Sequence, residues 1–264
     1  MNILAFWPLN DGPVQPPAQT PALDLVKSPG PFPGQYMTAP NVPTYDNVNM
    51  SSAAPGTFAV QQSGIVPGDT PLNATTLNFC ASFNGGFVKV PFAQALYPSA
   101  KFTVECWVQP SWTLDDVANT PAIRGVVVWA DGAGSGFAIT VTPDNFWAAN
   151  IGIGTGFFQL KADTQQIKLG EVSYLAMSFD PGTGAVQLFV GTASDTKPTP
   201  FMKTTPSGSI YSPVTNLPLF FGKGRCDLTN GLFPLNGFIQ DVAIYSTVLS
   251  NNDINTHFST GIGS

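Results

Sequence analysis

The acidic residues of this chain are too few and too scattered for acid–base catalysis on a sugar. A glycosidase holds two carboxyl groups roughly 5–9.5 Å apart across the bond that it breaks. The chain has only two glutamates, Glu105 and Glu171, in different predicted strands, and no acidic residue follows either one at two or four positions. Glu105 alternates with Thr103 and Trp107 on one strand face, where we expect a hydrogen-bonded polar role.

Histidine and cysteine chemistry is equally restricted. His257 is the only histidine, so a Ser-His-Asp, Cys-His or zinc site would have to use it. It stands near the end of a predicted terminal helix, and we expect it to be an exposed helix residue. The cysteines, Cys80, Cys106 and Cys226, form no CxxC pair, which argues against structural zinc. Cys80 and Cys106 lie in strand-like runs, either as small buried apolar side chains or as a disulfide.

Sugar binding needs a different set of residues, because a sugar has an apolar face and a rim of hydroxyl groups. An aromatic platform beside planar polar side chains suits both features. The candidates near predicted loops are Trp112 in PSWTLDD, Asp131 in WADGAGSG, and Arg225 with Asp227 in GKGRCDLTN. Trp147 lies inside a predicted strand and is expected in the core.

The overall charge excludes one class of partner. Charged residues make up 10% of the 264 residues and the net charge is −6, against a typical charged fraction of about 25%. The ten basic residues form no run, so binding of nucleic acid, which needs clustered Lys and Arg, is not expected. A surface of neutral polar groups, Pro and Gly suits an assembly protein or a sugar-binding protein.

No targeting or membrane segment is predicted. The opening MNILAFWPLNDG lacks a basic region and breaks at Pro8, unlike a signal peptide. No apolar run reaches the roughly 18 residues of a membrane span. The expected location is the cytoplasm, or outside the cell by a non-classical route, unless a signal has been removed.

Short apolar runs separated by turn residues predict an all-β fold. Val-, Ile-, Phe- and Thr-rich segments alternate with Gly, Asp, Asn and Pro turns, and no helical periodicity separates them. About a dozen such strands predict an antiparallel jelly-roll sandwich. The predicted strands are 3–9, 75–83, 86–91, 101–109, 124–130, 136–142, 145–151, 156–161, 172–180, 184–191, 217–223 and 235–246.

One short helix is predicted at the end, in LSNNDINTHF. Ser250 is its expected N-cap, and Asp253 stands at the third helical position, as in a capping box. Leu249 and Ile254 occupy the positions of a hydrophobic staple. Ile254 and Phe258, four residues apart, are expected to face the sandwich together.

A proline-rich segment interrupts this pattern. Thirteen of the 25 prolines precede residue 72, and residues 28–71 contain no Lys, Arg or Glu. Because proline cannot donate to a strand ladder, we expect poor β-sheet there. The aromatic residues Phe32, Tyr36, Tyr45 and Phe58 are expected to pin the segment as an arm to the sandwich, with a flexible loop as the alternative. We expect residues 1–264 to form one domain with this arm inserted at about 28–71.

Five segments, taken in their order along the chain, form a family-like pattern: FWPLNDG with PALDLVKSPG, LNFCASFNGGFVKVP, KFTVECWVQP, EVSYLAMSFDPGTGAVQLFVG, and LPLFFGKG with PLNGFIQDVAIYSTVLSNNDINTHF. In this order they resemble the concanavalin A-like, laminin G-like (LamG) jelly-roll family. The chain departs from the family pattern at Tyr174, at Gly191 with Thr192, and at Gln240. Members often hold calcium between the opening turn and the closing strand, which here implies Asp24 and Asp241. The change at Gln240 weakens that expectation, since calcium prefers six to eight oxygen ligands.

Together these features predict a non-catalytic, lectin-like module that binds a glycan or glycoconjugate, with calcium as a candidate cofactor. The alternative is a structural or assembly protein, in which the arm and the neutral surface join copies into an oligomer, coat or filament.

The first prediction follows from the missing carboxylate pair. The protein should release no reducing sugar from a β-glucan or a galactan in a steady-state assay. Sustained release that Glu105→Gln abolishes would show that a catalytic site exists.

Overall fold

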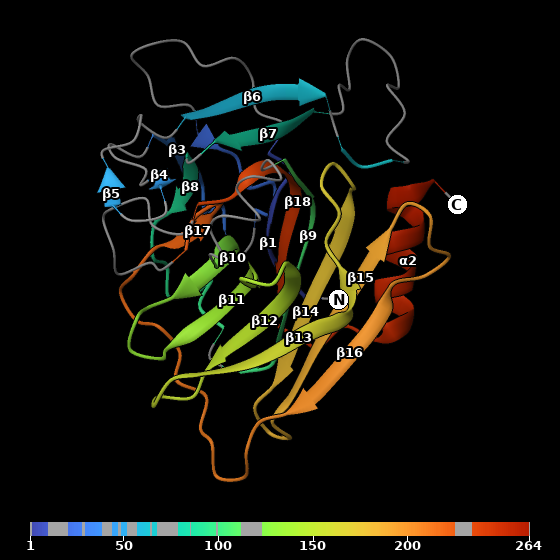
Figure 1. The fold of residues 1–264 in the computed structure, drawn as a ribbon. Helices are drawn as coiled ribbons and strands as arrows, with labels where there is room; N and C mark the ends of the chain where they lie inside the picture. Colours follow the sequence, from blue (N-terminus) through green and yellow to red (C-terminus); the bar gives the residue numbers. More distant parts are fainter. Residues whose placement is uncertain are drawn as a thin grey trace.

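The computed structural model describes residues 2–9, 21–27, 30–38, 44–46, 49–51, 57–63, 65–67, 79–84, 86–98, 100–111, 123–224 and 234–263. Two eight-stranded antiparallel sheets pack face to face (Figure 1). This confirms the predicted antiparallel sandwich with one short helix near its end. Among the described residues, no helix is long and apolar enough to span a membrane.

In the first sheet, sheet A, the first and last strands of the chain lie side by side. Strand β1 (Ile3–Trp7) pairs with β18 (Asn236–Tyr245), which lies beside β9 (Phe102–Pro110). The remaining strands of sheet A are β14 (Ser173–Asp180), β15 (Ala185–Thr192) and β16 (Thr199–Thr204) on one side, and β7 (Phe79–Asn84) and β6 (Thr57–Ser63) on the other.

The second sheet, sheet B, supplies the opposite outer face. Its order is β13 (Phe157–Gln166), β12 (Phe146–Gly152), β11 (Gly136–Val141), β10 (Arg124–Ala130), β17 (Leu219–Phe221), β8 (Phe87–Val90), β3 (Gly34–Met37) and β2 (Pro21–Ala22). A separate two-stranded hairpin joins β4 (Thr44–Asp46) and β5 (Asn49–Ser51).

The space between the sheets is filled by alternate residues of both. The tryptophans Trp7, Trp129 and Trp147 are buried there, and Trp7 meets Phe221 edge to face at 5.1 Å between ring centroids. The expected core position of Trp147 is thus confirmed. Cys106 is a free, fully buried thiol, so it forms no disulfide; the side chains of Cys80 and Cys226 lie outside the described residues.

The prediction that residues 28–71 are poor in β-sheet is wrong for the described part. Strand β3 pairs with β8, and β6 pairs with β7. Both segments, GQYM and TFAVQQS, are free of proline, so their ladders are not interrupted. Anchoring by aromatic residues is confirmed for Tyr36, which is buried, and for Phe32, which packs against the core. The side chains of Tyr45 and Phe58 lie outside the described residues.

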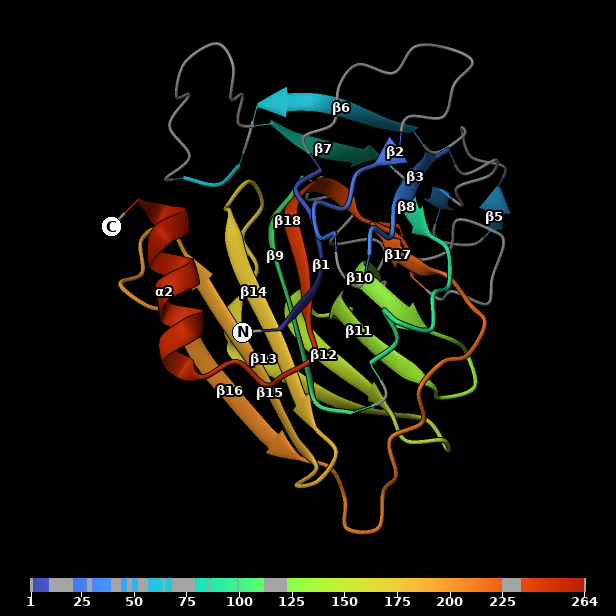
Figure 2. The ribbon, with the colours of Figure 1, turned by 180° about the vertical axis from the view of Figure 1, so that it is seen from behind.

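Helix α2 (Asn251–Ile262) covers part of the outer face of sheet A (Figures 1 and 2). It begins as predicted, since the Ser250 hydroxyl accepts from the Asp253 backbone and the Asp253 carboxylate accepts from the Ser250 backbone. Ile254 and Phe258 are buried against the sheet, and Phe258 stacks on Trp107 with ring centroids 5.9 Å apart. Full burial of each such side chain contributes about 1.5–3 kcal/mol.

Two glycines set how closely α2 approaches the sheet. A Cβ added at Gly191 would lie 2.7 Å from the Phe258 ring, and one at Gly261 would clash with the Trp107 indole even more closely. The departure from the family pattern at Gly191 therefore has a steric reason: the strand makes room for Phe258.

The second prediction concerns this close packing. Gly191→Ala and Gly261→Ala should each lower the free energy of unfolding by about 1–3 kcal/mol, because an extra methyl group overpacks the interface. Gly182→Ala is the matched control, since its added Cβ would meet only the Asp180 carboxylate, at 3.2 Å. Urea denaturation checks this; equal stability of all three variants would show that the helix is not packed as described.

Candidate functional site

A groove of about 490 Å³ lies on the outer face of sheet B. Its floor is one row of residues directly opposite one another across four strands: Val128, Ala138, Asn150 and Gln159. Side chains alternate between the two faces of a strand, so the neighbours of these residues point into the core while the row itself faces outward. The groove falls within the 300–1,000 Å³ of typical ligand pockets.

The polar end of this row is a hydrogen-bonded chain. The Asn150 amide donates to the Thr140 hydroxyl at 2.8 Å, and the Gln159 amide donates to Asn150 Oδ1 at 3.0 Å. Each side chain thereby holds its neighbour in one orientation. Gln159 is exposed, and its side-chain amide also carries a carbonyl oxygen, which can accept from a hydroxyl group.

The other walls are apolar or small. Ala130 and Ala138 leave space above the sheet, and Phe157 and Ile123 line the groove with 39% and 41% of their surfaces exposed. Asp131 lies at one end, where its Oδ1 accepts from the backbone of Ala133 and Ser135 in the β10–β11 turn, both at 2.9 Å. Among the described residues, no hydrogen bond reaches Asp131 Oδ2, which is the remaining acceptor at this end.

The structure brings one of the four predicted sugar-binding residues, Asp131, into the groove. Gly224, which precedes Arg225 in the chain, also lines it. Trp112, Arg225 and Asp227 themselves lie outside the described residues.

Sequence reasoning missed Asn150, Gln159, Thr140 and Phe157. The available signal was alternation: in NFWAANI and GFFQLK, the polar residues stand on the face opposite Trp147 and Leu160, which are buried.

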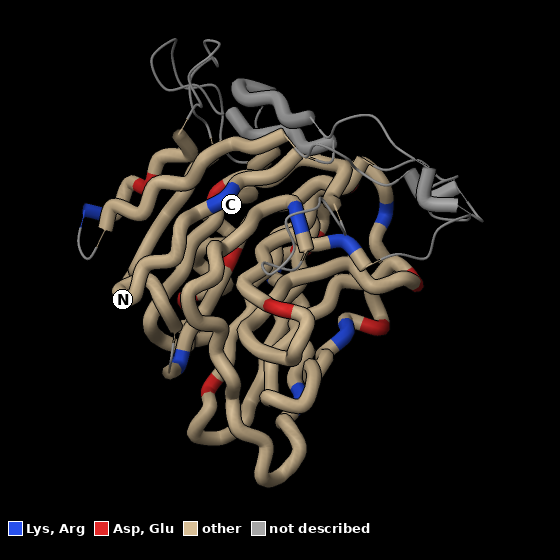
Figure 3. Tube along the Cα trace, turned by 90° about the vertical axis from the view of Figure 1, so that its left-hand side faces the viewer, with Lys and Arg blue, Asp and Glu red and all other residues tan. Residues whose placement is uncertain are grey.

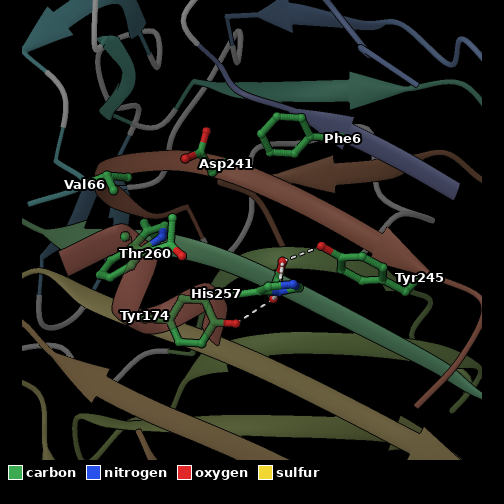
Figure 4. Close-up of a pocket in the computed structure, with 10 residues that line it drawn as sticks. Phe6, Val66, Tyr174, Asp241, Tyr245, His257 and Thr260 are labelled. Carbon is green, nitrogen blue, oxygen red and sulfur yellow. Dashed lines mark hydrogen bonds and ion pairs between the residues drawn. The ribbon is translucent and has the colours of Figure 1, made fainter. Parts of the chain in front are cut away.

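A second polar cluster lies on the outer face of sheet A, under α2 (Figure 4). The Glu105 carboxylate accepts from the hydroxyl groups of Tyr174 and Tyr245, both at 2.6 Å. His257 Nδ1 lies 3.1 and 3.0 Å from the two carboxylate oxygens. The expected hydrogen-bonded role of Glu105 is therefore confirmed, and three strands and the helix meet at one buried carboxylate.

The expectation that His257 is an exposed helix residue is wrong. Its side chain is 23% exposed and faces Glu105. The reason is helical spacing: His257 precedes Phe258 and follows Ile254 by three positions, so it lies at the edge of the buried stripe.

Burial and the Glu105 charge set the protonation of this cluster. Burial, and then the neighbouring carboxylate, raises the pKa of Tyr174 and of Tyr245 far above the usual value, so both remain neutral donors. The hydrogen bond to Glu105 raises the pKa of His257, while burial opposes the shift. Burial also raises the pKa of the Cys106 thiol, with a contribution from Glu105, which leaves that thiol unreactive.

In this arrangement Glu105 accepts hydrogen bonds from its neighbours and is not placed to transfer a proton to a substrate. Three donors converge on it, and its side chain is only 10% exposed. A general acid or base must reach a proton on the substrate. Among the described residues, then, the chemistry around Glu105 is that of a structural anchor.

The two residues implied as calcium ligands serve other contacts. Asp24 Oδ1 accepts from the backbone of Phe6 and Val26, both at 2.9 Å, and Oδ2 accepts from that of Phe32 at 2.8 Å. These bonds fasten the opening turn to β1 and to the arm. Asp241 lies at an irregularity in β18, with φ of 53°, and lines the cavity beside Glu105.

The described residues fit calcium poorly. Three backbone donors already approach Asp24, whereas calcium needs six to eight oxygens that are open to it. No group of three or more His, Cys, Asp or Glu side chains is placed to hold a metal ion within the described part of the chain. Calcium binding stays a prediction from the family resemblance, without support from the geometry at Asp24.

Charge is sparse outside these sites. In Figure 3, Lys, Arg, Asp and Glu lie singly along the described trace. Lys101 pairs with Asp180 at 3.1 Å, and Lys161 pairs with Asp144 at 2.7 Å. The groove on sheet B therefore presents mainly neutral polar and apolar groups.

A sequence profile of the concanavalin A-like lectin/glucanases superfamily matches residues 84–255. No curated protein sequence matches the chain significantly. The matched residues include most strands of both sheets and the start of α2.

Several solved structures share the fold at low sequence identity. The binding domain of botulinum neurotoxin serotype D is 14% identical, with a TM-score of 0.56, over 98% of this chain and 51% of that one. A structure of botulinum neurotoxin type C, whose cell entry is described as dependent on interaction with two ganglioside molecules, is 10% identical, with a TM-score of 0.54. The match covers 98% of this chain and 51% of that one. The binding domain of Paraclostridial Mosquitocidal Protein 1 is 14% identical, with a TM-score of 0.52, over 77% and 47%. The chain spans about half the length of these structures.

The third prediction concerns the pair of His257 with Glu105. Folding raises the pKa of His257, so the charged pair stabilises the folded protein. This contribution is complete at pH values below the pKa of His257 in the unfolded chain, about 6.5. It is lost as the pH rises through the pKa of His257 in the folded protein. His257→Asn keeps an N–H group near the position of Nδ1 but cannot ionise. It should cost about 1–2 kcal/mol near pH 5 and less near pH 9.

Urea denaturation of both proteins across this pH range measures the difference. A stability gap that is constant with pH, or that grows as pH rises, would contradict the assignment of the charged pair.

Proposed function

Because the chain belongs to the concanavalin A-like lectin/glucanases superfamily, we propose that it is a non-catalytic carbohydrate-binding module. Its glycan site is the groove on the outer face of sheet B. The observation that carries this proposal is the hydrogen-bonded set of Thr140, Asn150 and Gln159 beside apolar lining residues and the partly exposed ring of Phe157.

The chemistry of the groove suits a sugar. Amide and hydroxyl groups can both donate and accept, as sugar hydroxyls do. Their mutual hydrogen bonds fix their directions before a ligand arrives, which reduces the entropic cost of binding. Val128, Ala130 and Ala138 supply the apolar surface for the C–H face of a ring, with Phe157 at the side.

The positions of the described carboxylates support the proposed lack of catalysis. Among the described residues that line the groove, Asp131 is the one acidic side chain, and hydrolysis of a glycosidic bond commonly needs two. Glu105 lies on the other sheet and is bound by three donors.

The similar structures support binding as the general role. Two of them are binding domains by description, and one is described by its interaction with gangliosides, which are glycolipids. Their low identity limits the comparison to the fold, so the ligand of this chain is argued from its own groove.

Assembly into an oligomer, the alternative function, has less support. The described strands of the proline-rich segment, β3 and β6, are paired within this chain. Strand β3 lies between β2 and β8 and needs no second copy to satisfy its backbone, whereas β6 pairs with β7 at the edge of sheet A. Oligomerisation stays a prediction that light scattering can test.

The fourth prediction tests the groove. A glycan array should identify a ligand, and calorimetry with that glycan should show roughly tenfold weaker binding for Gln159→Ala, equivalent to about 1.4 kcal/mol. Ala138→Leu should abolish binding, because its side chain fills the floor of the groove without removing a polar group.

Gln187→Ala is the matched control. Gln187 is also a strand amide, but it lies on sheet A and accepts from Ser178. If the control weakens glycan binding as much as Gln159→Ala does, or if Ala138→Leu binds normally, the groove is not the site. No response on a broad array would sink the proposed function itself.

A further inference from the structure

A second cavity, of about 260 Å³, lies between α2, β1 and β18 on the outer face of sheet A. Figure 4 shows Phe6 and Asp241 on one side and His257, Tyr174 and Tyr245 on the other. One water molecule occupies about 30 Å³ of liquid, so the cavity has room for a small organic group. The glycan groove lies on the other sheet and does not use this space.

The walls of the cavity are aromatic and acidic. Phe6, Trp107, Tyr174 and Tyr245 supply rings from four strands, and Glu105 and Asp241 supply carboxylates. No Lys or Arg is among the described residues that line it. Aromatic faces and carboxylates both attract cations, and the attraction grows where water is excluded.

The hydrogen bonds inside the cluster sharpen this preference. The tyrosine hydroxyls donate their protons to Glu105, and His257 Nδ1 faces the same carboxylate. A carboxylate can only accept, so the Nδ1 proton points at Glu105. The phenolic oxygens keep lone pairs, so the cavity lining combines hydrogen-bond acceptors with aromatic side chains.

Asp241 owes its position to the backbone of β18. Its φ of 53° lies in the left-handed region, and the pairing of β18 with β9 shifts register between Gln240 and Ala243. Irregularities of this kind re-aim a side chain next to binding sites. Here the irregularity brings a second carboxylate to the cavity that holds Glu105, although the two residues lie on different strands.

We propose that this cavity binds a small organic ammonium ion, such as the trimethylammonium head of choline. The aromatic side chains that line the cavity suit the methyl groups, and the carboxylates of Asp241 and Glu105 in the same lining suit the positive charge. This assignment is independent of the glycan site, so either can fail without the other.

Ligand binding should compete with protonation of His257. The groups around this imidazole are Glu105 on β9, Tyr174 on β14, Tyr245 on β18 and Asp253 on its own helix, and Asp241 lines the same cavity. A protonated His257 places a positive charge in the wall, so a cationic ligand binds less well. Affinity should fall as pH is lowered from about 8 to about 5.

Calorimetry with choline chloride, in a sodium chloride background of equal ionic strength, measures this directly. We expect a Kd on the order of 1 mM and at least roughly tenfold weaker binding of 3,3-dimethylbutan-1-ol, the uncharged analogue of the same shape. Nε-trimethyllysine is a second probe, which distinguishes a methylated protein side chain from a free amine. Equal binding of the neutral analogue, or no choline binding at about 50 mM, would overturn the proposal.

Asp241→Asn removes the charge at the rim and suits the backbone, because asparagine tolerates positive φ. It should weaken choline binding roughly tenfold, because one of the two carboxylates near the cation is lost. Asp144→Asn changes the net charge equally, but Asp144 pairs with Lys161 on the other sheet, so its choline affinity should equal that of the parent. Equal weakening in both variants would indicate a general charge effect and contradict the site.

A measurement on the unaltered protein removes any dependence on variants that fold poorly. His257 is the only histidine, so its imidazole protons give one unambiguous NMR titration. Saturating choline should lower its pKa, by the reciprocity of coupled binding. An unchanged His257 titration at saturating choline would show that the ligand binds elsewhere.

Discussion

The buried carboxylate of Glu105 is the constraint on which the arrangement of this molecule depends. A charge removed from water is costly unless it is fully hydrogen-bonded, and here the partners come from β14, β18 and α2. None of these contacts is local in the sequence: His257 is 152 residues from Glu105. Satisfying one carboxylate therefore requires three strands to be in register and the final helix to be seated.

The seated helix makes the two outer faces of the sandwich different. On sheet A, α2 and its apolar residues Ile254 and Phe258 cover Trp107 and Tyr174. On sheet B, none of the described helices or strands takes that position over the groove, and the outward row carries Ala138, Asn150 and Gln159. A covered face suits structural anchoring and a narrow cavity at the helix edge, whereas an open face with preset amides suits a ligand with many hydroxyl groups.

The sequence predicted those features that depend on residues close together in the chain. Short apolar runs between turn residues located strands such as β10, β12 and β14, and the Ser250–Asp253 capping box located the start of α2. The strand segments of the proline-rich region were missed because composition hides short proline-free stretches, and because their partners, β8 and β7, are distant in the chain. Asp131 was found through its turn, but Asn150 and Gln159 belong together only through the register of β12 with β13. The role of His257 was misjudged for the same reason, since its partners come from other elements.

The central claim is that the outward row of sheet B binds a glycan while the opposite face does not. The most direct measurement is an NMR titration of the isotope-labelled protein with a glycan that the protein retains on an array, following the side-chain amide signals. The account predicts that the Asn150 and Gln159 amide signals shift in a saturable way while the His257 imidazole signal stays in place. Shifts confined to His257 and α2, with the signals of Asn150 and Gln159 unchanged, would contradict it.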